Sequence, residues 1–212
     1  MSALTSLGPS ILRRGGARIR ADRVSNNLTE RQAWMLLEAA ECSLRRRTPY
    51  NRFITIAWER GGLDAKDSVE TTGQFIKAAR DWLHCRGERL DWAWVQESGP
   101  GNAHCHILLH VPRTLDPLFR PMPLRWVKRL LGGHYGKGVL QSQRLVICAS
   151  PDGYPPAQRA ELLGKVHYML KTAPAASEQT LGMVGMGYKS WGRSCLVHGK
   201  RCAVRPRSKA HY

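Results

Sequence analysis

A glutamate and two histidines lie near the middle of this chain, on either side of a short segment. Glu97 ends the run Trp-Ala-Trp-Val-Gln-Glu, and His104 and His106 open the run His-Cys-His-Ile-Leu-Leu-His. The residues between the two runs, Ser-Gly-Pro-Gly-Asn-Ala, are typical of a turn. Because aromatic and branched apolar residues dominate both runs, the segments 92–97 and 104–110 predict a β-hairpin.

That hairpin would bring the three side chains together as a metal site. Successive strand residues point to opposite faces, so His104 and His106 share a face, and closing the hairpin at this turn places Glu97 opposite His104. Directly opposed residues have Cβ atoms roughly 4.5–5.5 Å apart, which allows one carboxylate and two imidazoles to bind a single cation. Such a set suits a divalent ion that also binds substrate. The alternative is a pair of half-exposed strand histidines, because His-x-His alone is a weak pattern.

A tyrosine and a lysine form a second candidate group. Tyr168 and Lys171 are three residues apart near the end of a helix predicted over 156–171, so they lie on the same side of it. Gly164, one turn earlier, would leave room for a ligand, although a helical glycine costs about 1 kcal/mol relative to alanine. The phenol is a potential nucleophile that the lysine could assist. The alternative is a packed tyrosine beside a solvated lysine, since partly buried tyrosines are common.

The charge of the chain indicates a polyanionic partner. Lys and Arg number 33 against 16 Asp and Glu, which gives a formal net charge of +17. A nucleic acid would neutralise this charge and reduce the self-repulsion of the chain, so we expect a nucleic acid as the partner. A membrane is less favoured, because the sequence has no apolar run of about 18 residues. The N-terminus has no charged start followed by a long apolar stretch, so we expect a cytoplasmic protein. Its length and 42% hydrophobic content predict one domain with a sizeable core.

Basic residues are concentrated in both tails and on one predicted helix, and we expect some of them to contact DNA. Residues 1–26 have the composition of a basic flexible arm, and residues 173–212 form a basic C-terminal extension in which basic residues alternate with aromatic ones. The alternative is that these segments are solvated and bind nothing. The candidate DNA-binding residues are Arg13, Arg14, Arg125, Lys128, Arg129, Lys189, Trp191, Lys200 and Arg201.

The elements that must position these groups can be predicted from periodicity and turn residues. A capping-box spacing from Thr29 to Gln32 starts a helix over about 30–46, and β-forming residues after Pro49 predict a central strand. The predicted order is a helix at 30–46, a strand at 52–58, a helix at 67–83, the hairpin, a helix at 124–131, a strand at 138–147 and, as the last regular element, the helix at 156–171.

Taken in order, these features resemble the HUH endonuclease superfamily and, within it, the rolling-circle replication initiators (Rep proteins). In that family a His-hydrophobic-His motif on a central strand binds the metal, often with an upstream acidic residue, and a later Tyr-x-x-Lys carries the nucleophile. The matching features are the strand at 52–58, Glu97, His104-Cys105-His106, and Tyr168-x-x-Lys171, within residues 50–172. Cys105 stands where a bulkier apolar residue is usual, and a single tyrosine in the later motif argues against a two-tyrosine mechanism.

The resemblance implies a fold and an activity. The fold would be a single α+β domain over residues 27–172, with a central antiparallel sheet of about five strands flanked by helices, similar to ferredoxin-like and RRM-like folds. Glu97, His104 and His106 would hold Mg²⁺ or Mn²⁺, and Tyr168, assisted by Lys171, would attack a phosphodiester of single-stranded or origin DNA.

The expected products are a 5′-phosphotyrosine linkage and a free 3′-hydroxyl that primes rolling-circle replication, with host replication proteins as further partners. The alternatives are a relaxase or single-tyrosine transposase of the same superfamily, or a basic nucleic-acid-binding protein without catalysis.

Overall fold

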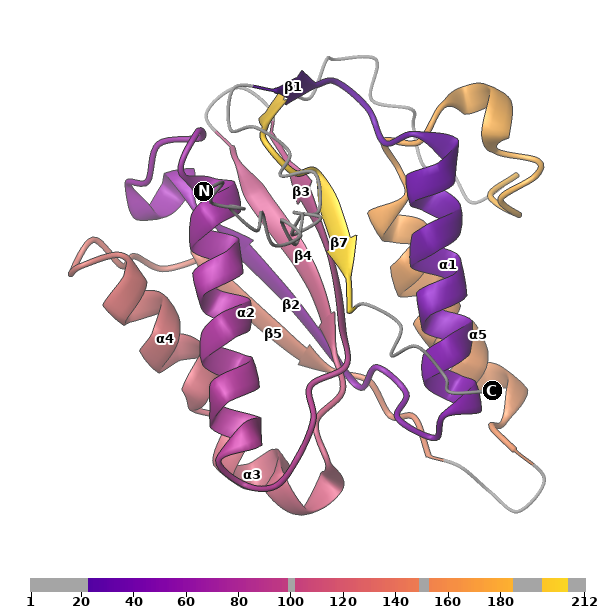
Figure 1. Ribbon diagram of the computed structural model, residues 1–212, viewed down its shortest axis with the longest axis horizontal. Coiled ribbons are helices and arrows are strands. Elements are labelled where there is room, and N and C mark those ends of the chain that lie inside the picture. The colour runs from indigo at the N-terminus through magenta and orange to yellow at the C-terminus, as the bar shows by residue number, and fades with distance from the viewer. Residues whose placement is uncertain (1–22, 99–101, 149–152, 185–195, 206–212) are drawn as a thin grey trace, which may run out of the picture.

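A five-stranded antiparallel sheet lies between two layers of helices (Figure 1). The computed structural model describes residues 23–98, 102–148, 153–184 and 196–205. The helices α2 (Ser68–His84) and α4 (Met122–Leu130) cover one face of the sheet, and α1 (Glu30–Arg45) and α5 (Pro156–Met169) cover the other. The predicted fold class, a single α+β domain with a central antiparallel sheet of about five strands, is confirmed.

The sheet is built around the predicted hairpin. Its strand order is β5-β2-β4-β3-β7, and all neighbours are antiparallel. The bounds are Arg52–Ala57 for β2, Trp92–Glu97 for β3, His104–Leu109 for β4, Leu140–Arg144 for β5 and Cys202–Val204 for β7. The strands β1 (Val24–Ser25) and β6 (Val197–His198) form a separate two-stranded sheet, and the short helices are η1 (Glu59–Gly61), η2 (Arg113–Leu115), α3 (Asp116–Phe119) and η3 (Ala175–Ser177).

Both faces of the central strands are buried, because helices cover the sheet on both sides. Ile107 of β4 packs in the cluster beneath α2 and α4, whereas its neighbour Leu108 packs in the cluster beneath α1 and α5. Side chains alternate between the faces, so His104 and His106 lie on the side of Leu108, towards α1 and α5. The two histidines are therefore enclosed between the sheet and a helical layer rather than facing solvent.

The helices predicted before and after the hairpin are present. Thr29 and Gln32 form the predicted capping box at the start of α1, with reciprocal hydrogen bonds of 2.8 and 3.2 Å. The helices predicted at 67–83, 124–131 and 156–171 correspond to α2, α4 and α5. Among the described helices, none is long and apolar enough to cross a membrane.

The expectation that the helix at 156–171 is the last regular element is wrong. Two short strands follow it: β6, which pairs with β1, and β7, which pairs with β3 and forms an edge of the main sheet. The proposed boundary at residue 172 therefore cuts through the structure, since part of the C-terminal extension belongs to the sheet. A strand of three residues flanked by Lys and Arg has no readable alternation, and only its long-range pairing defines it.

Candidate metal centre

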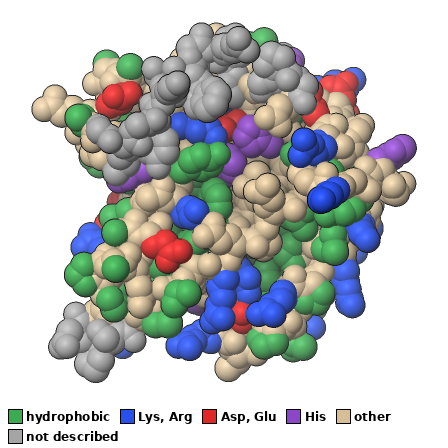
Figure 2. All heavy atoms as spheres, turned by 180° about the vertical axis from the view of Figure 1, so that it is seen from behind, with side chains coloured by type: hydrophobic (Ala, Val, Ile, Leu, Met, Phe, Trp, Pro, Cys, Tyr) green, Lys and Arg blue, Asp and Glu red, His purple; other side chains and the backbone are tan. Residues whose placement is uncertain are grey.

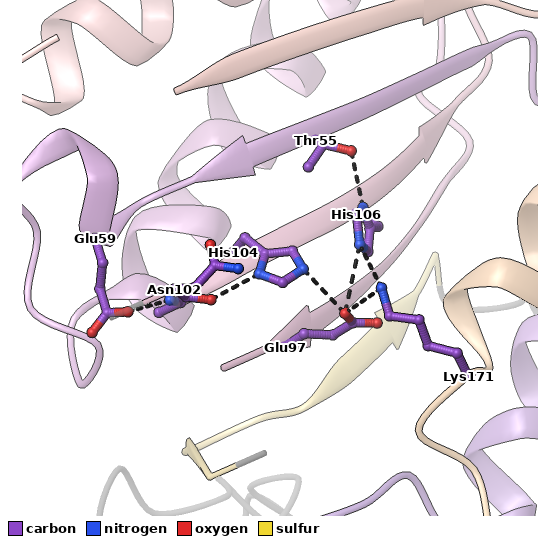
Figure 3. Close-up of polar contacts among 8 residues, drawn as sticks. Thr55, Glu59, Glu97, Asn102, His104, His106 and Lys171 are labelled. Carbon is purple, nitrogen blue, oxygen red and sulfur yellow. Dashed lines mark hydrogen bonds and ion pairs between the residues drawn. The ribbon is translucent and has the colours of Figure 1, made fainter. Parts of the chain in front are cut away.

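Glu97, His104 and His106 converge at one end of the sheet, as the hairpin predicts. Glu97 and His104 are direct partners across β3 and β4, which confirms the predicted register. Oε2 of Glu97 lies 3.1 Å from Nε2 of His104 and 3.6 Å from Nε2 of His106 (Figure 3). One ligand atom from each residue lies within 4.8 Å of the others, and this is the one such group of three found in the described ranges. These side chains are therefore spaced to share a cation.

The ring orientations of the two histidines are set by hydrogen bonds at their Nδ1 atoms. Nδ1 of His106 lies 2.9 Å from the hydroxyl of Thr55 on β2, and Nδ1 of His104 lies 2.8 Å from the backbone oxygen of Asn102 (Figure 3). Phe53 stacks on His106 at 5.5 Å between ring centroids and 13° between planes. Both Nε2 atoms thus face Glu97, which is the arrangement that supporting contacts give to metal-binding histidines.

Thr55 and Phe53 are parts of this site that were not predicted from the sequence. Thr55 is the partner of His106, and Phe53 the partner of Leu108, in the pairing of β2 with β4. Alternation along the predicted strand at 52–58 places both residues on one face, so that signal was present. What the sequence lacks is the register of β2 against β4, because no short turn connects these two strands.

The carboxylate of Glu97 is ionised although it is almost completely buried. The side chain of Glu97 is 4% exposed. Burial raises the pKa of its carboxyl, but hydrogen bonds from His104 and His106 and the positive charge of Lys171 outweigh burial and hold the pKa well below the ordinary range. Burial also lowers the pKa of His106, and Lys171 adds to that effect against the opposing influence of Glu97. The site therefore pairs an anionic oxygen with a neutral imidazole at pH 7, the protonation states in which both groups bind metals.

Lys171 contributes the cation that balances this buried carboxylate. Its Nζ lies 2.7 Å from Oε2 of Glu97 and 3.4 Å from Nε2 of His106, and its side chain is 11% exposed (Figure 3). The predicted contact of Lys171 with Tyr168 is present, with Nζ 4.0 Å from the centroid of the tyrosine ring. The contact of Lys171 with Glu97 was not anticipated, because Lys171 follows α5 whereas Glu97 ends β3.

Tyr168 faces the same site from α5. Its ring centroid lies 5.0 Å from that of His106, with an interplanar angle of 70°, and 6.2 Å from that of Phe53. Tyr168 is 37% exposed, so its ring contacts the buried histidine and remains open to an incoming group. The structure thus brings together the five residues predicted as metal ligands and catalytic groups.

The candidate DNA-binding residues are not gathered in the same way. Arg125, Lys128 and Arg129 are exposed on α4, which covers the face of the sheet opposite to His104 and His106. Lys200 is exposed between β6 and β7. Figure 2 shows lysine and arginine side chains dispersed over one face of the molecule rather than concentrated in a single patch. Their role in DNA binding therefore stays a prediction.

Arg201 is buried and does not face solvent. It was predicted to contact DNA, but it is 1% exposed, and its guanidinium donates hydrogen bonds to the hydroxyl and the backbone oxygen of Ser25. Arg201 therefore connects the segment before β7 to β1 instead of presenting a charge to a ligand. The remaining candidates, Arg13, Arg14, Lys189 and Trp191, lie outside the described residues.

Comparisons with known proteins assign no family to this chain. No protein-family model, no curated protein and no solved structure matches it.

Proposed function

We propose that this protein is a metal-dependent enzyme that nicks and rejoins single-stranded DNA by tyrosine transesterification, in the manner of an HUH rolling-circle replication initiator. The observation that carries the proposal is the position of Tyr168. A partly exposed phenol ring lies 5.0 Å from the ring of His106, within a group of one carboxylate and two imidazoles. Nucleophile and candidate metal ligands come from segments far apart in the sequence, so their meeting reflects the tertiary fold.

The residues present fit Mg²⁺ or Mn²⁺. Oε1 of Glu97 is buried and has no hydrogen-bond partner among the described residues. An unpaired buried carboxylate oxygen is costly, and a bound cation would satisfy it. When bound by Glu97, His104 and His106, the ion would polarise the scissile phosphate and offset the charge that develops on it. This donor set, with two imidazoles and one carboxylate, leaves positions for substrate oxygens.

Tyr168 acts as the nucleophile in this proposal. Its phenolic oxygen forms a bond to phosphorus, and the bond between phosphorus and the 3′-oxygen breaks. The phenol loses a proton and the leaving 3′-oxygen gains one. The products are a 5′-phosphotyrosine and a free 3′-hydroxyl. The reverse attack by a 3′-hydroxyl restores a phosphodiester without an external energy source, because the covalent linkage preserves the bond energy.

Lys171 is placed to stabilise this reaction. Its ammonium lies 4.0 Å from the centre of the Tyr168 ring and 2.7 Å from Glu97. A cation between the phenol and the metal ligands favours the developing phenolate and the negatively charged transition state. The amine remains on a flexible four-carbon stem, so it can follow the phosphate as charge accumulates.

The test is covalent capture of DNA. The protein is incubated with a randomised pool of single-stranded DNA and Mn²⁺, and denaturing electrophoresis detects protein-linked DNA, which is then sequenced. Tyr168→Phe should abolish the adduct and leave DNA affinity within about twofold, because only the reacting oxygen is removed. Tyr135→Phe is the matched control, since Tyr135 packs with the cluster on the opposite face of the sheet. An adduct in Tyr168→Phe would show that the nucleophile is another residue, and DNA binding without any adduct in the wild type would indicate a non-catalytic binding protein.

A further inference from the structure

An open groove runs from the metal centre to the edge of the sheet. Its volume is ≈ 620 Å³, and its walls come from β2, β5 and α5. His106 and Tyr168 lie in its lining, so a ligand in the groove would contact the imidazole and the proposed nucleophile. The side of the groove away from α5 is formed by Gln141, Ser142 and Gln143 of β5.

The strand β5 presents two amide side chains to this groove. Gln141 pairs with Thr55 and Gln143 with Phe53, so both glutamines lie on the face that carries His106. Both are exposed, and β5 is the first strand in the order of the sheet, with one strand neighbour among the described elements. Glutamine amides can donate and accept hydrogen bonds at the same time, which is how they recognise base edges such as that of adenine.

The spacing of these amides favours an unstacked strand over a duplex. Residues two apart on a β-strand are separated by about 6.6 Å, whereas successive stacked bases are about 3.4 Å apart. Two glutamines at positions i and i+2 therefore match bases that are pulled apart. A single strand can be extended in this way, but a duplex cannot without unstacking.

The helical wall of the groove is open at Gly164 and basic at Lys165. A Cβ added to Gly164 would meet no atom within 4 Å other than those of its chain neighbours and the nearby backbone of its own helix, so the absence of a side chain there leaves space in the groove. The Nζ of Lys165 lies 5.3 Å from the centroid of the Phe53 ring, within reach of a phosphate in the same space. Glu161, one turn before Lys165 on α5, is the one carboxylate in this lining. Because its negative charge repels a phosphate, we place the phosphate beside Lys165 and away from Glu161.

We infer that this groove is the binding subsite for a single-stranded DNA segment next to the scissile phosphate, in which Gln141 and Gln143 contact base edges and Lys165 contacts the backbone. The inference rests on the proposed function for the identity of the ligand. Tyr168 is partly exposed at the end of the groove, and its ring supplies an aromatic face on which the base nearest the scissile phosphate can stack. Gln141 and Gln143 then determine which sequence is presented to the nucleophile.

Filling the groove is the direct test. Gly164→Leu adds a side chain into space that holds no protein atom, and it replaces a helical glycine, so thermal stability should be equal to or higher than that of the wild type. Gly73→Leu is the matched control, because Gly73 is also helical and a Cβ added there also meets nothing within 4 Å, but Gly73 is exposed and lies in α2 on the opposite face. DNA affinity is measured by fluorescence anisotropy with a labelled single-stranded oligonucleotide in EDTA, so that cleavage does not contribute.

Gly164→Leu should weaken single-strand binding by at least about tenfold, because the leucine would occupy the space of a base, and the loss of one stacked base costs roughly 5- to 150-fold in affinity. The affinity of Gly73→Leu should stay within about twofold of the wild type. Equal affinities of Gly164→Leu and wild type would overturn the inference, as would equal wild-type affinity for a duplex of the same sequence. Because the measurement needs neither metal nor nicking, its failure is separable from failure of the proposed reaction.

The base contacts have a separate readout. Gln143→Ala should change the base preference next to the attachment site in the pool of captured DNA, by the roughly 5- to 150-fold that one bidentate contact provides. An unchanged preference in both Gln143→Ala and Gln141→Ala would overturn the assignment of these amides, even if the groove binds DNA.

Discussion

Replacing Lys171 should strengthen metal binding, although this lysine is a proposed catalytic group. In the structure its ammonium lies 2.7 Å from Oε2 of Glu97 and 3.4 Å from Nε2 of His106, two of the atoms available to a metal. A second cation at that oxygen is repelled by the ammonium, so metal binding requires Lys171 to move. Lys171→Met keeps a long unbranched side chain and removes the charge.

The size of the effect follows from the ion pair that the metal must break. At an effective dielectric of about 20, opposite charges 2.7 Å apart attract by about 6 kcal/mol. Hydration of the displaced amine offsets most of this attraction. If about a quarter remains as a net cost of displacement, roughly 1.4 kcal/mol, the wild type binds the metal about tenfold more weakly than Lys171→Met.

The assay is isothermal titration calorimetry or the electron paramagnetic resonance of free Mn²⁺, with metal-stripped protein at pH 7.5. Lys165→Met is the matched control, because it removes a charge from α5 at a residue that packs on Phe53 instead of Glu97, and its metal affinity should be within about twofold of the wild type. Thermal melting checks that each variant is folded. A dissociation constant for Lys171→Met that is equal to or weaker than that of the wild type would show that Lys171 does not compete with the metal. Lys171→Arg, which retains the positive charge, should not show the gain in affinity.

Three further predictions test the surroundings of the site and the fold. Thr55→Val removes the hydroxyl that orients the buried imidazole and should weaken Mn²⁺ binding about 10- to 100-fold, measured by the same titration. Asp116→Ala should lower the free energy of unfolding by roughly 3–5 kcal/mol in urea denaturation, because it leaves the buried guanidinium of Arg52 without its main partner; a loss below about 1 kcal/mol would contradict the buried ion pair. Burial raises the pKa of Cys105 to about 12, so a thiol reagent at pH 8 should modify exposed Cys85 and reach Cys105 only after denaturation, as mass spectrometry of the labelled peptides would show.

The hairpin and the order of most elements could be predicted from the sequence because their signals are local. A turn segment between two apolar runs sets the register of β3 against β4, and this register alone places Glu97 opposite His104. Capping at Thr29 and the helical apolar stripes likewise depend on neighbours a few residues away. Tyr168 and Lys171 share one side of a helix for the same reason, since their spacing is close to one turn.

Only the tertiary structure decided which distant segments complete the site. The packing of α5 on the sheet brings Lys171 to the carboxylate, and the pairing of β2 with β4 brings Thr55 to His106. Strand β7 depends on pairing with β3 from the middle of the chain, and the burial of Arg201 depends on its contact with Ser25 in β1. Such contacts are chosen by the packing of whole layers, because burial energy depends on total apolar area and shape rather than on any local spacing. The sequence alone therefore specifies the candidate metal ligands and the proposed nucleophile, whereas the lysine beside those ligands and the neighbouring groove are consequences of how the helices pack on the sheet.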